Sequence, residues 1–322
     1  MRAAVIDRYG TPEVMELREV ATPTPRAGEV LVRVHAASVN DWDWGLLRGT
    51  SFAIRMLHGL FTPKVRIIGG DIAGRVEEVG KDVKAFRPGD EVYGDLCMCG
   101  FGAFAEYARA PEACLAHKPP GMTFEQAAAI PQAGMLAVQG LIDVGRIRSG
   151  QTLLLNGAGG GVGTIALQIA RLHDVEVTAV DKAGKLDMLR TMGAHHVIDY
   201  LEEDFTRRGN RYDLILDVKT NRSPLAYARA LRPHGTYATV GGSIPRLLQA
   251  VVLGPLVSRV SDKHLRLVTL KPNKDLAYMN ELFEAGKLVP VMEGPYTLAD
   301  VPEAFRLFGS GNQRGKIIIT IP

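Results

Sequence analysis

The chain has 322 residues, of which 46% are hydrophobic and 23% are charged, and it carries a formal net charge of +3. This length is more than one ordinary hydrophobic core needs and predicts two domains. The small net charge, without a basic stripe interleaved with aromatic residues, argues against nucleic acid as a partner. No apolar run approaches the roughly 18 residues of a membrane span, and the first residues do not follow the pattern of a signal peptide. We therefore expect a cytoplasmic protein without a membrane partner.

The first part of the chain, to about residue 124, is typical of a compact β-barrel-like domain. Residues 29–35 alternate apolar and polar side chains, as a half-buried strand does. Turn sequences rich in Pro, Gly and Asp, such as residues 87–90, separate such segments.

From about residue 125 the pattern changes to strands and helices in alternation, which is typical of a parallel doubly wound sheet. Strands are predicted at residues 152–156, 175–180, 196–199, 213–217 and 235–240. A last apolar strand at 316–321 falls outside this alternation, and we expect it to return to the first domain. The predicted domains are therefore residues 1–124 with 272–322, and residues 125–271.

The strongest motif lies in residues 151–170. An apolar run leads into a loop with five glycines within seven residues, and a segment with helical apolar spacing follows. A strand, a glycine-rich turn and a helix together present helix N–H groups to a pyrophosphate. Gly160 and Gly163 stand at the second and third positions of the dinucleotide fingerprint, and Ala158 takes the first. We expect a phosphate loop formed by Asn156, Gly157, Gly159, Gly160, Gly161, Val162 and Gly163.

The residue that ends the next strand bears on the choice between NAD and NADP. Asp181 stands about 20 residues beyond the loop, where an acid accepts the ribose hydroxyls and repels a 2′-phosphate. Lys182 and Lys185 follow it, and either can pair with a phosphate. Their alternative role is a solvated helix start, so these residues alone leave both cofactors open.

Taken together, these landmarks resemble the medium-chain dehydrogenase/reductase superfamily and, within it, the zinc-independent quinone oxidoreductase-like branch, including reductases similar to the mitochondrial reticulon-4-interacting protein. The motifs that carry the resemblance are residues 37–44, 69–80, 87–92, 102–107, 156–163 and 270–273. The resemblance implies an α/β fold with a GroES-like β-barrel catalytic domain and a Rossmann parallel-sheet domain. It also implies an active site in the cleft between them.

Zinc-dependent members of this superfamily use Cys and His as catalytic ligands, but this chain has Asn40, Gly70 and Gln132 at the matching positions. Asp41, Asp71 and Gln132 offer an alternative oxygen site, although zinc favours sulfur and imidazole. The structural zinc lobe of the family needs four clustered cysteines, and the chain has three cysteines in all. We expect no metal.

The cysteines do not suggest a disulfide framework. Cys97 and Cys99 are separated by a single residue, which is shorter than the usual spacing of zinc ligands. We expect them to be reduced thiols in a loop, in keeping with a reducing compartment.

Without a metal, the expected chemistry is hydride transfer from a nicotinamide, in which the protein supplies orientation and electrostatics. Quinones and α,β-unsaturated carbonyls suit such a site, because the charge that develops on their oxygen can be stabilised by hydrogen-bond donors. The resemblance implies Asn40 as a donor and Asp43 as a residue that orients its neighbours. A salt bridge to Arg48 or a turn cap is the alternative role of Asp43.

The resemblance also implies further cofactor contacts, and it favours NADPH while NAD remains possible. These contacts are Tyr200 by the adenosine, Val218, Gly241 and Gly242 in the crevice of the sheet, and Lys271 and Asn273. The expected partner is a small-molecule substrate, and we expect a homodimer, for which the apolar stretch 243–265 is a candidate contact or a lid. The competing functions are an alcohol dehydrogenase-like activity and a nucleotide-binding sensor or structural protein with vestigial catalysis.

Overall fold

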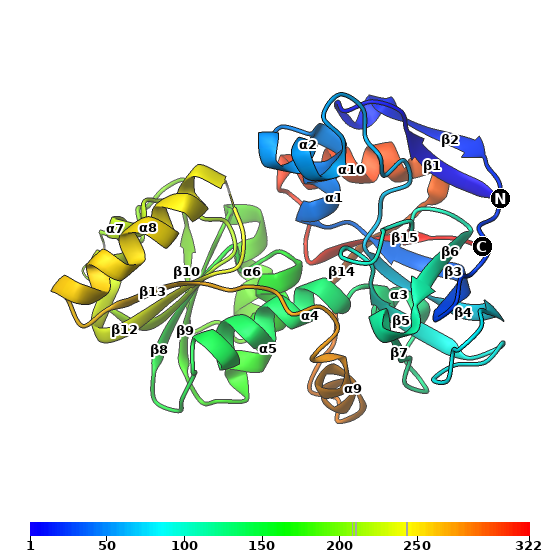
Figure 1. Ribbon diagram of the computed structural model, residues 1–322. Helices are drawn as coiled ribbons and strands as arrows, with labels where there is room; N and C mark the ends of the chain where they lie inside the picture. The colour runs from blue at the N-terminus through cyan, green and yellow to red at the C-terminus, as the bar shows by residue number, and fades with distance from the viewer. Residues whose placement is uncertain (208, 210, 243) are drawn as a thin grey trace. The chain divides into compact units, whose positions relative to one another are not determined.

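The computed structural model describes residues 1–207, 209, 211–242 and 244–322. It divides into two compact units (Figure 1). Unit 1 combines Met1–Gln132 with Pro272–Pro322, and unit 2 is Ala133–Lys271.

The first boundary between the two units lies after residue 132, whereas the sequence predicts it after residue 124. The difference is helix α3 (Phe124–Ala128), which packs on strands of unit 1. The Phe124 ring stacks on the His35 ring of unit 1 with 4.5 Å between ring centroids, and this contact helps to hold α3 on unit 1. Thr123 caps α3, since its Oγ1 accepts from the Gln126 N–H while Gln126 Oε1 accepts from the Thr123 N–H.

Unit 1 is built on a sheet in the order β14-β15-β3-β4-β5-β7, with β6 also paired to β3, and on a separate ladder β1-β2. These pairs are antiparallel except β14 with β15. The strands are β1 (Arg2–Ile6), β2 (Met15–Glu19), β3 (Glu29–Ser38), β4 (Asp71–Val79), β5 (Glu91–Asp95), β6 (Tyr107–Pro111), β7 (Leu115–His117), β14 (Met292–Thr297) and β15 (Lys316–Thr320).

The core of unit 1 is filled by alternate residues of these strands. Val30, Val32 and Val34 of β3 are buried, as the alternating pattern predicts. Ile319 of β15 and Phe305 of a covering helix belong to the same cluster. The helices of unit 1, besides α3, are α1 (Asp41–Arg48), α2 (Phe52–His58), α9 (Leu276–Glu284) and α10 (Val301–Ser310).

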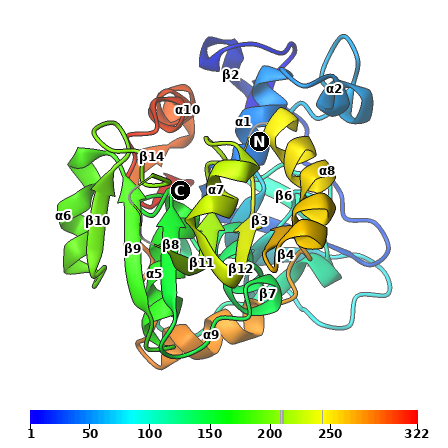
Figure 2. The same ribbon diagram turned by 90° about the vertical axis from the view of Figure 1, so that its left-hand side faces the viewer.

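Unit 2 contains a parallel sheet in the order β10-β9-β8-β11-β12-β13, which Figure 2 shows nearly in full. The predicted doubly wound parallel sheet is therefore confirmed. The strands are β8 (Thr152–Asn156), β9 (Glu176–Asp181), β10 (His196–Asp199), β11 (Tyr212–Asp217), β12 (Leu231–Thr239) and β13 (His264–Leu267). The sequence does not predict β13, because this edge strand has two exposed residues in four and lacks an apolar run.

The helices that connect the strands of unit 2 are α5 (Gly161–Arg171), α6 (Ala183–Thr191), α7 (Pro224–Ala230) and α8 (Ile244–Val260). Helix α4 (Pro131–Val138) begins in unit 1 and continues into unit 2 as a π-helix (Gln139–Val144). Most of the apolar stretch 243–265 is thus helix α8, and residue 243 lies outside the described residues. The order of the strands reverses between β8 and β11. In an open parallel sheet, ligands bind beyond the carboxyl ends of the strands at such a point.

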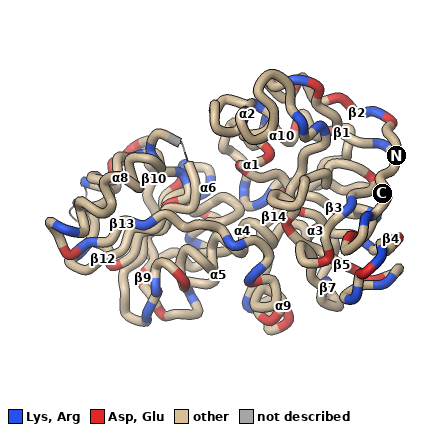
Figure 3. Tube along the Cα trace, viewed as in Figure 1, with Lys and Arg blue, Asp and Glu red and all other residues tan. Residues whose placement is uncertain are grey.

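Charged residues of both signs are interspersed along each unit (Figure 3). Within the described part of the chain, every helix is too short or too polar to cross a membrane.

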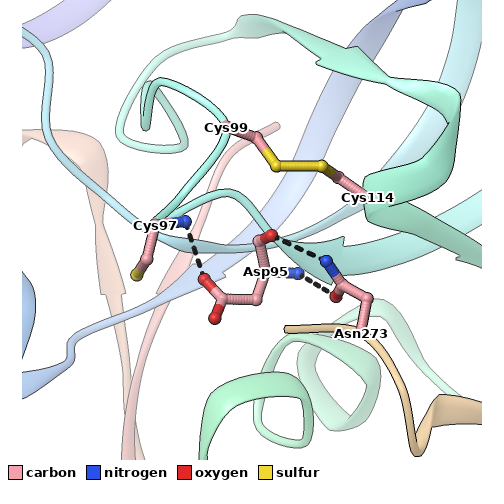
Figure 4. Close-up of a disulfide and its surroundings, with 5 residues drawn as sticks. All are labelled: Asp95, Cys97, Cys99, Cys114 and Asn273. Atoms are coloured by element: carbon pink, nitrogen blue, oxygen red, sulfur yellow. Dashed lines mark hydrogen bonds between the residues drawn. A yellow bond between two sulfur atoms is a disulfide. The ribbon is translucent and has the colours of Figure 1, made fainter. Parts of the chain in front are cut away.

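The cysteines differ from the sequence prediction (Figure 4). Cys99 forms a disulfide with Cys114, while Cys97 is a buried free thiol. Strand β5 pairs with β7. The 97–101 loop follows β5 and Cys114 directly precedes β7, so this pairing brings the segments of the two cysteines together. The prediction of two reduced thiols was wrong for Cys99, and the cysteines no longer argue for a reducing compartment.

Candidate functional site

The loop between β8 and α5 has a backbone suited to binding an anion. Gly157 has a φ of +84°, and the N–H groups of Gly157 and Ala158 donate to the Val180 carbonyl at 3.0 and 3.1 Å. Gly160 is the N-cap of α5. The N–H groups of the first helical turn have no partner within the helix, and the helix dipole adds positive charge there. This terminus therefore fits the pyrophosphate of a dinucleotide.

Glycine serves two different purposes at positions 160 and 163. A Cβ built on Gly160 meets no described atom closer than the Gly157 oxygen at 3.7 Å, whereas a Cβ on Gly163 stands 2.4 Å from that oxygen. Gly163 thus lets α5 pack closely on the strand end, and Gly160 leaves room for a group that approaches the backbone. Gly161 and Val162, beside Gly160, are partly exposed.

Asn156 joins the two strands at which the sheet order reverses. Its Nδ2 donates to Asp217 Oδ1 at 2.8 Å and to the Tyr227 hydroxyl at 3.0 Å. Burial raises the pKa of Asp217. The Val218 N–H donates to the Asn156 carbonyl at 3.0 Å. The Asn156 side chain therefore holds the strand ends in place.

Asp181 is bound to the phosphate loop itself. Its Oδ2 accepts from the Gly159 N–H at 2.8 Å, its Oδ1 accepts from the Lys182 N–H at 2.9 Å, and Lys185 Nζ lies 3.3 Å away. Both side chains of the ion pair are almost fully buried, at 6% exposed for Asp181 and 5% for Lys185. Burial lowers the pKa of Lys185, although Asp181 opposes that shift. Lys185 is therefore not the solvated residue that the sequence allowed, while its role as a phosphate ligand stays a prediction.

Other predicted cofactor residues surround this edge of the sheet. The Tyr200 N–H donates to the Asp181 carbonyl at 3.3 Å, and burial raises the pKa of its phenol. Gly242 has a φ of +121°, and the Gly241 carbonyl accepts from the Thr220 hydroxyl.

One cationic residue at this edge was not predicted from the sequence. Lys219 is exposed, and its stem covers Gly157, since a Cβ there would lie 2.9 Å from Lys219 Cγ. A lysine two residues after the apolar strand β11 is the signal that would have suggested it.

Lys271 and Asn273 are held through main-chain contacts. In unit 2, Gln139 accepts from the Lys271 N–H and donates to its carbonyl, both at 2.9 Å. In unit 1, Asn273 Oδ1 accepts from the Asp95 N–H at 2.9 Å and its Nδ2 donates to the Asp95 carbonyl at 3.0 Å (Figure 4). The structure thus gives the Asn273 amide a structural partner at the end of β5.

A buried polar cluster lies in unit 1 where β3, β4 and β15 meet. Lys316, the first residue of β15, is 5% exposed. Its Nζ donates to Asn40 Oδ1, to Asp71 Oδ2 at 2.8 Å and to the Val39 carbonyl at 3.3 Å. Lys316 was not predicted as a site residue, although a lysine at the start of an otherwise apolar strand was a visible signal in the sequence.

Asp43 connects the start of α1 to the segment before β4. Its Oδ2 accepts from the Asn40 N–H at 2.9 Å, and its Oδ1 accepts from the Gly69 N–H at 3.0 Å. Its side chain is fully buried, and this burial, with a contribution from the charge of Asp71, raises its pKa to about 8. The bonding of Asp43 is that of a helix cap, while Arg48 lies over the Trp44 ring at 5.1 Å.

The cluster continues from Asp71 toward the end of β5. Asp71 Oδ1 accepts from the Gln132 N–H at 3.1 Å, and Gln132 Nε2 donates to Cys97 Sγ at 3.0 Å. The Cys97 N–H donates in turn to Asp95 Oδ1 at 2.8 Å. Burial raises the pKa of Asp95, as does the neighbouring charge of Asp71. A continuous network therefore runs from Asn40 to Asp95 inside unit 1.

The residues at the positions of the family's zinc ligands do not fit a zinc ion. A Cβ on Gly70 would stand 2.2 Å from Cys97 Sγ, so this position has no room for a ligand side chain. The Lys316 ammonium already bonds to the oxygens that a cation would use, and Asp41 is exposed whereas Asp71 is buried. Among the described side chains, no three or more of His, Cys, Asp and Glu are grouped so that they could hold a metal.

Two family models match the chain. The alcohol dehydrogenase GroES-like domain matches residues 26–120, and the zinc-binding dehydrogenase family matches residues 192–319. The predicted GroES-like domain is thereby confirmed.

Three curated relatives cover the chain almost completely. The chloroplastic quinone-oxidoreductase QR1 of Triphysaria versicolor is 32% identical over 333 aligned residues, which cover 99% of this chain and 98% of that protein. The 2-methylene-furan-3-one reductase of Solanum lycopersicum is 31% identical, covering 99% and 79%. The human mitochondrial NAD(P)H oxidoreductase RTN4IP1 is 31% identical, covering 100% and 89%.

A solved structure supports the same relationship. The quinone oxidoreductase from Coxiella burnetii superimposes with a TM-score of 0.89 at 26% identity, covering 100% of this chain and 99% of that one. The chain belongs to the medium-chain dehydrogenase/reductase superfamily, in its quinone oxidoreductase branch.

Proposed function

We propose that this protein is an NAD(P)H-dependent oxidoreductase that transfers hydride to quinones or α,β-unsaturated carbonyls. The carrying observation is the phosphate loop of unit 2, where Gly160 leaves open space above the N-terminus of α5. The relatives named as quinone oxidoreductase and furanone reductase supply the substrate class.

The chain's own residues have separate tasks in this reaction. The first turn of α5 would bind the pyrophosphate, with Lys219 as a nearby positive charge. The bound nicotinamide supplies the hydride. Asn40 would donate a hydrogen bond to the carbonyl oxygen of the acceptor, which gains negative charge as hydride adds. A proton from solvent would then complete the product.

We propose that the enzyme prefers NADPH and also uses NADH. An acid that selects NADH needs free oxygen lone pairs for the ribose hydroxyls. The carboxylate of Asp181 already interacts with two backbone N–H groups and with Lys185, and its charge is compensated by that lysine. Repulsion of a 2′-phosphate is therefore weaker than the sequence position of the acid suggests.

We also propose that catalysis is independent of zinc, since Gly70, Asn40 and Lys316 leave no ligand set that suits this metal. A dialysed sample that keeps full activity after chelation, with less than stoichiometric zinc by elemental analysis, would support this.

A homodimer is the proposed assembly. Helix α8 exposes Leu248, Val252 and Val260, and such an apolar face is suited to burial against a second copy. Light scattering of the purified protein tests the assembly.

A cytoplasmic location remains our prediction, to be tested by cell fractionation, because relatives include chloroplastic and mitochondrial proteins.

The function is tested by following NADPH and NADH oxidation with a panel of quinones and enones. Turnover with these acceptors, without oxidation of simple alcohols by NAD⁺ or NADP⁺, is the expected result. Cofactor binding without turnover of any acceptor would instead favour a nucleotide-binding sensor.

A further inference from the structure

The orientation of the Asn40 side-chain amide is set by a buried charge. A lysine ammonium carries only hydrogen-bond donors, so the Asn40 atom that faces Lys316 Nζ has to be the carbonyl Oδ1. The reverse orientation would place an NH₂ group against an ammonium. The ammonium therefore determines which end of the amide points away from it.

The opposite end of this amide lacks a partner within the part of the chain that the structure describes. Among the described residues, Asn40 Nδ2 is buried and makes no hydrogen bond, although the whole side chain is only 5% exposed. An unpaired buried donor is costly in a folded protein, and it is expected where a ligand supplies the missing acceptor.

Lys316 is itself held firmly in place. Asp71, its anionic partner, is fully buried and also accepts from the Ser38 hydroxyl at 2.9 Å and from the Gln132 N–H at 3.1 Å. Strand β15 pairs with β3 through Ile318 and Ser38, which fixes the start of β15 beside Asn40. An ammonium with three acceptors and a rigid backbone cannot easily release the Asn40 carbonyl.

We propose that Lys316 is a positioning residue, which together with Asp71 orients the Asn40 amide so that its Nδ2 donates to the carbonyl oxygen of the hydride acceptor. This inference rests on the proposed function. The hydride would come from a C–H bond of the reduced nicotinamide, which breaks with its electron pair; it forms a new C–H bond on the acceptor, whose π electron pair moves onto the oxygen. The Nδ2–H stabilises that charge until a solvent proton neutralises it.

Replacement of Lys316 by methionine should lower the rate of catalysis. Without the ammonium, the Asp71 carboxylate attracts the NH₂ of Asn40, and the amide turns its oxygen toward the acceptor. We expect kcat to fall by about 100-fold, as for loss of one oriented donor. Asn40→Ala should lose a similar factor, and Asn40→Asp, which keeps an oxygen toward Lys316 but has no NH₂, should lose at least as much.

A double-mutant cycle separates positioning from a purely structural role. In the Asn40→Ala background, Lys316→Met should change kcat by less than about twofold, because no amide is left to orient. The dissociation constant of NADPH from fluorescence titration should stay within about twofold in all variants. Lys287→Met, which removes an exposed lysine of unit 1, is the matched control and should leave kcat unchanged.

Each outcome of the cycle supports or overturns the positioning role of Lys316. If Lys316→Met is too unstable to assay, Lys316→Gln takes its place, since its amide can still donate to Asp71 but does not hold Asn40 by charge. Its loss in kcat should likewise vanish in the Asn40→Ala background. Equal losses in both backgrounds, or an unchanged kcat in the single variant, would overturn the positioning role while leaving the proposed function intact. Absence of wild-type turnover with every quinone and enone would overturn both.

Discussion

Replacement of Gly160 by valine should abolish cofactor binding without unfolding the protein. Beyond its chain neighbours, a Cβ at this position lies no closer than 3.7 Å to any described protein atom, so the new side chain starts in open space above the N-terminus of α5. The backbone of Gly160 is extended, with a φ of −91°, which valine adopts readily. The loss of a favourable N-cap residue should cost about 1 kcal/mol of folding free energy at most.

The effect on binding should be much larger. The valine methyl groups keep the pyrophosphate from the N–H groups of the first helical turn, which removes several charge-assisted hydrogen bonds. Loss of even two such bonds, at about 1.5–3 kcal/mol each, corresponds to at least a 100-fold increase in the dissociation constant.

Gly163→Ala provides the contrasting control. Its Cβ would stand 2.4 Å from the Gly157 oxygen, so α5 has to move, and we expect a loss of about 1–3 kcal/mol in folding free energy. Denaturant unfolding and fluorescence titration with NADPH measure both quantities for both variants. Wild-type affinity of Gly160→Val for NADPH, or a lower stability of this variant than of Gly163→Ala, would refute the assigned role of Gly160.

Three further predictions follow from individual contacts. Lys185→Met should weaken NADPH binding more than NADH binding, by about fivefold at low salt, because Asp181 loses its compensating charge; titrations with both cofactors at two salt concentrations would show this. Cys114→Ser should lower the folding free energy by about 3 kcal/mol, as expected for a bridge across 15 residues, and dithiothreitol should destabilise the wild type but not the variant. The carboxyl of Asp43 has a pKa of about 8 in the folded protein against an ordinary value of 3.8, so the native state holds a proton that the unfolded state has lost between these pH values. Stability should therefore fall as pH rises from 6 to 8, by up to about 1.4 kcal/mol per pH unit, and Asp43→Asn should flatten that slope in thermal melts.

The sequence predicted those parts of the fold that depend on local pattern. The strands from β8 to β12 have apolar runs, and the glycine loop has a spacing that few other structures require. Edge strand β13 was missed because its pattern is half exposed. The disulfide between Cys99 and Cys114 was missed because spacing along the chain does not reveal which loops a sheet brings together.

The candidate site was predicted less completely, and the reason is physical. Asp181, Lys182 and Lys185 were identified by position, but sequence could not show that Lys185 folds back onto the acid. Similarly, Asn40 was predicted as a donor, while the residue that contacts it stands 276 positions later in the chain. Contacts between segments that distant depend on strand pairing, here of β15 with β3, and leave no local trace.

The cluster in unit 1 bears on the kind of substrate that this protein is proposed to reduce. A zinc ion carries two charges and lowers the pKa of an alcohol or water bound to it. The cation of this cluster is instead the Lys316 ammonium, whose charge is already balanced by Asp71 and whose three donors are all used within the protein. With its donors used in this way, the ammonium has none left for a substrate oxygen. It can fix a neutral amide donor beside it, and a single oriented N–H suits an oxygen that becomes charged only as hydride arrives.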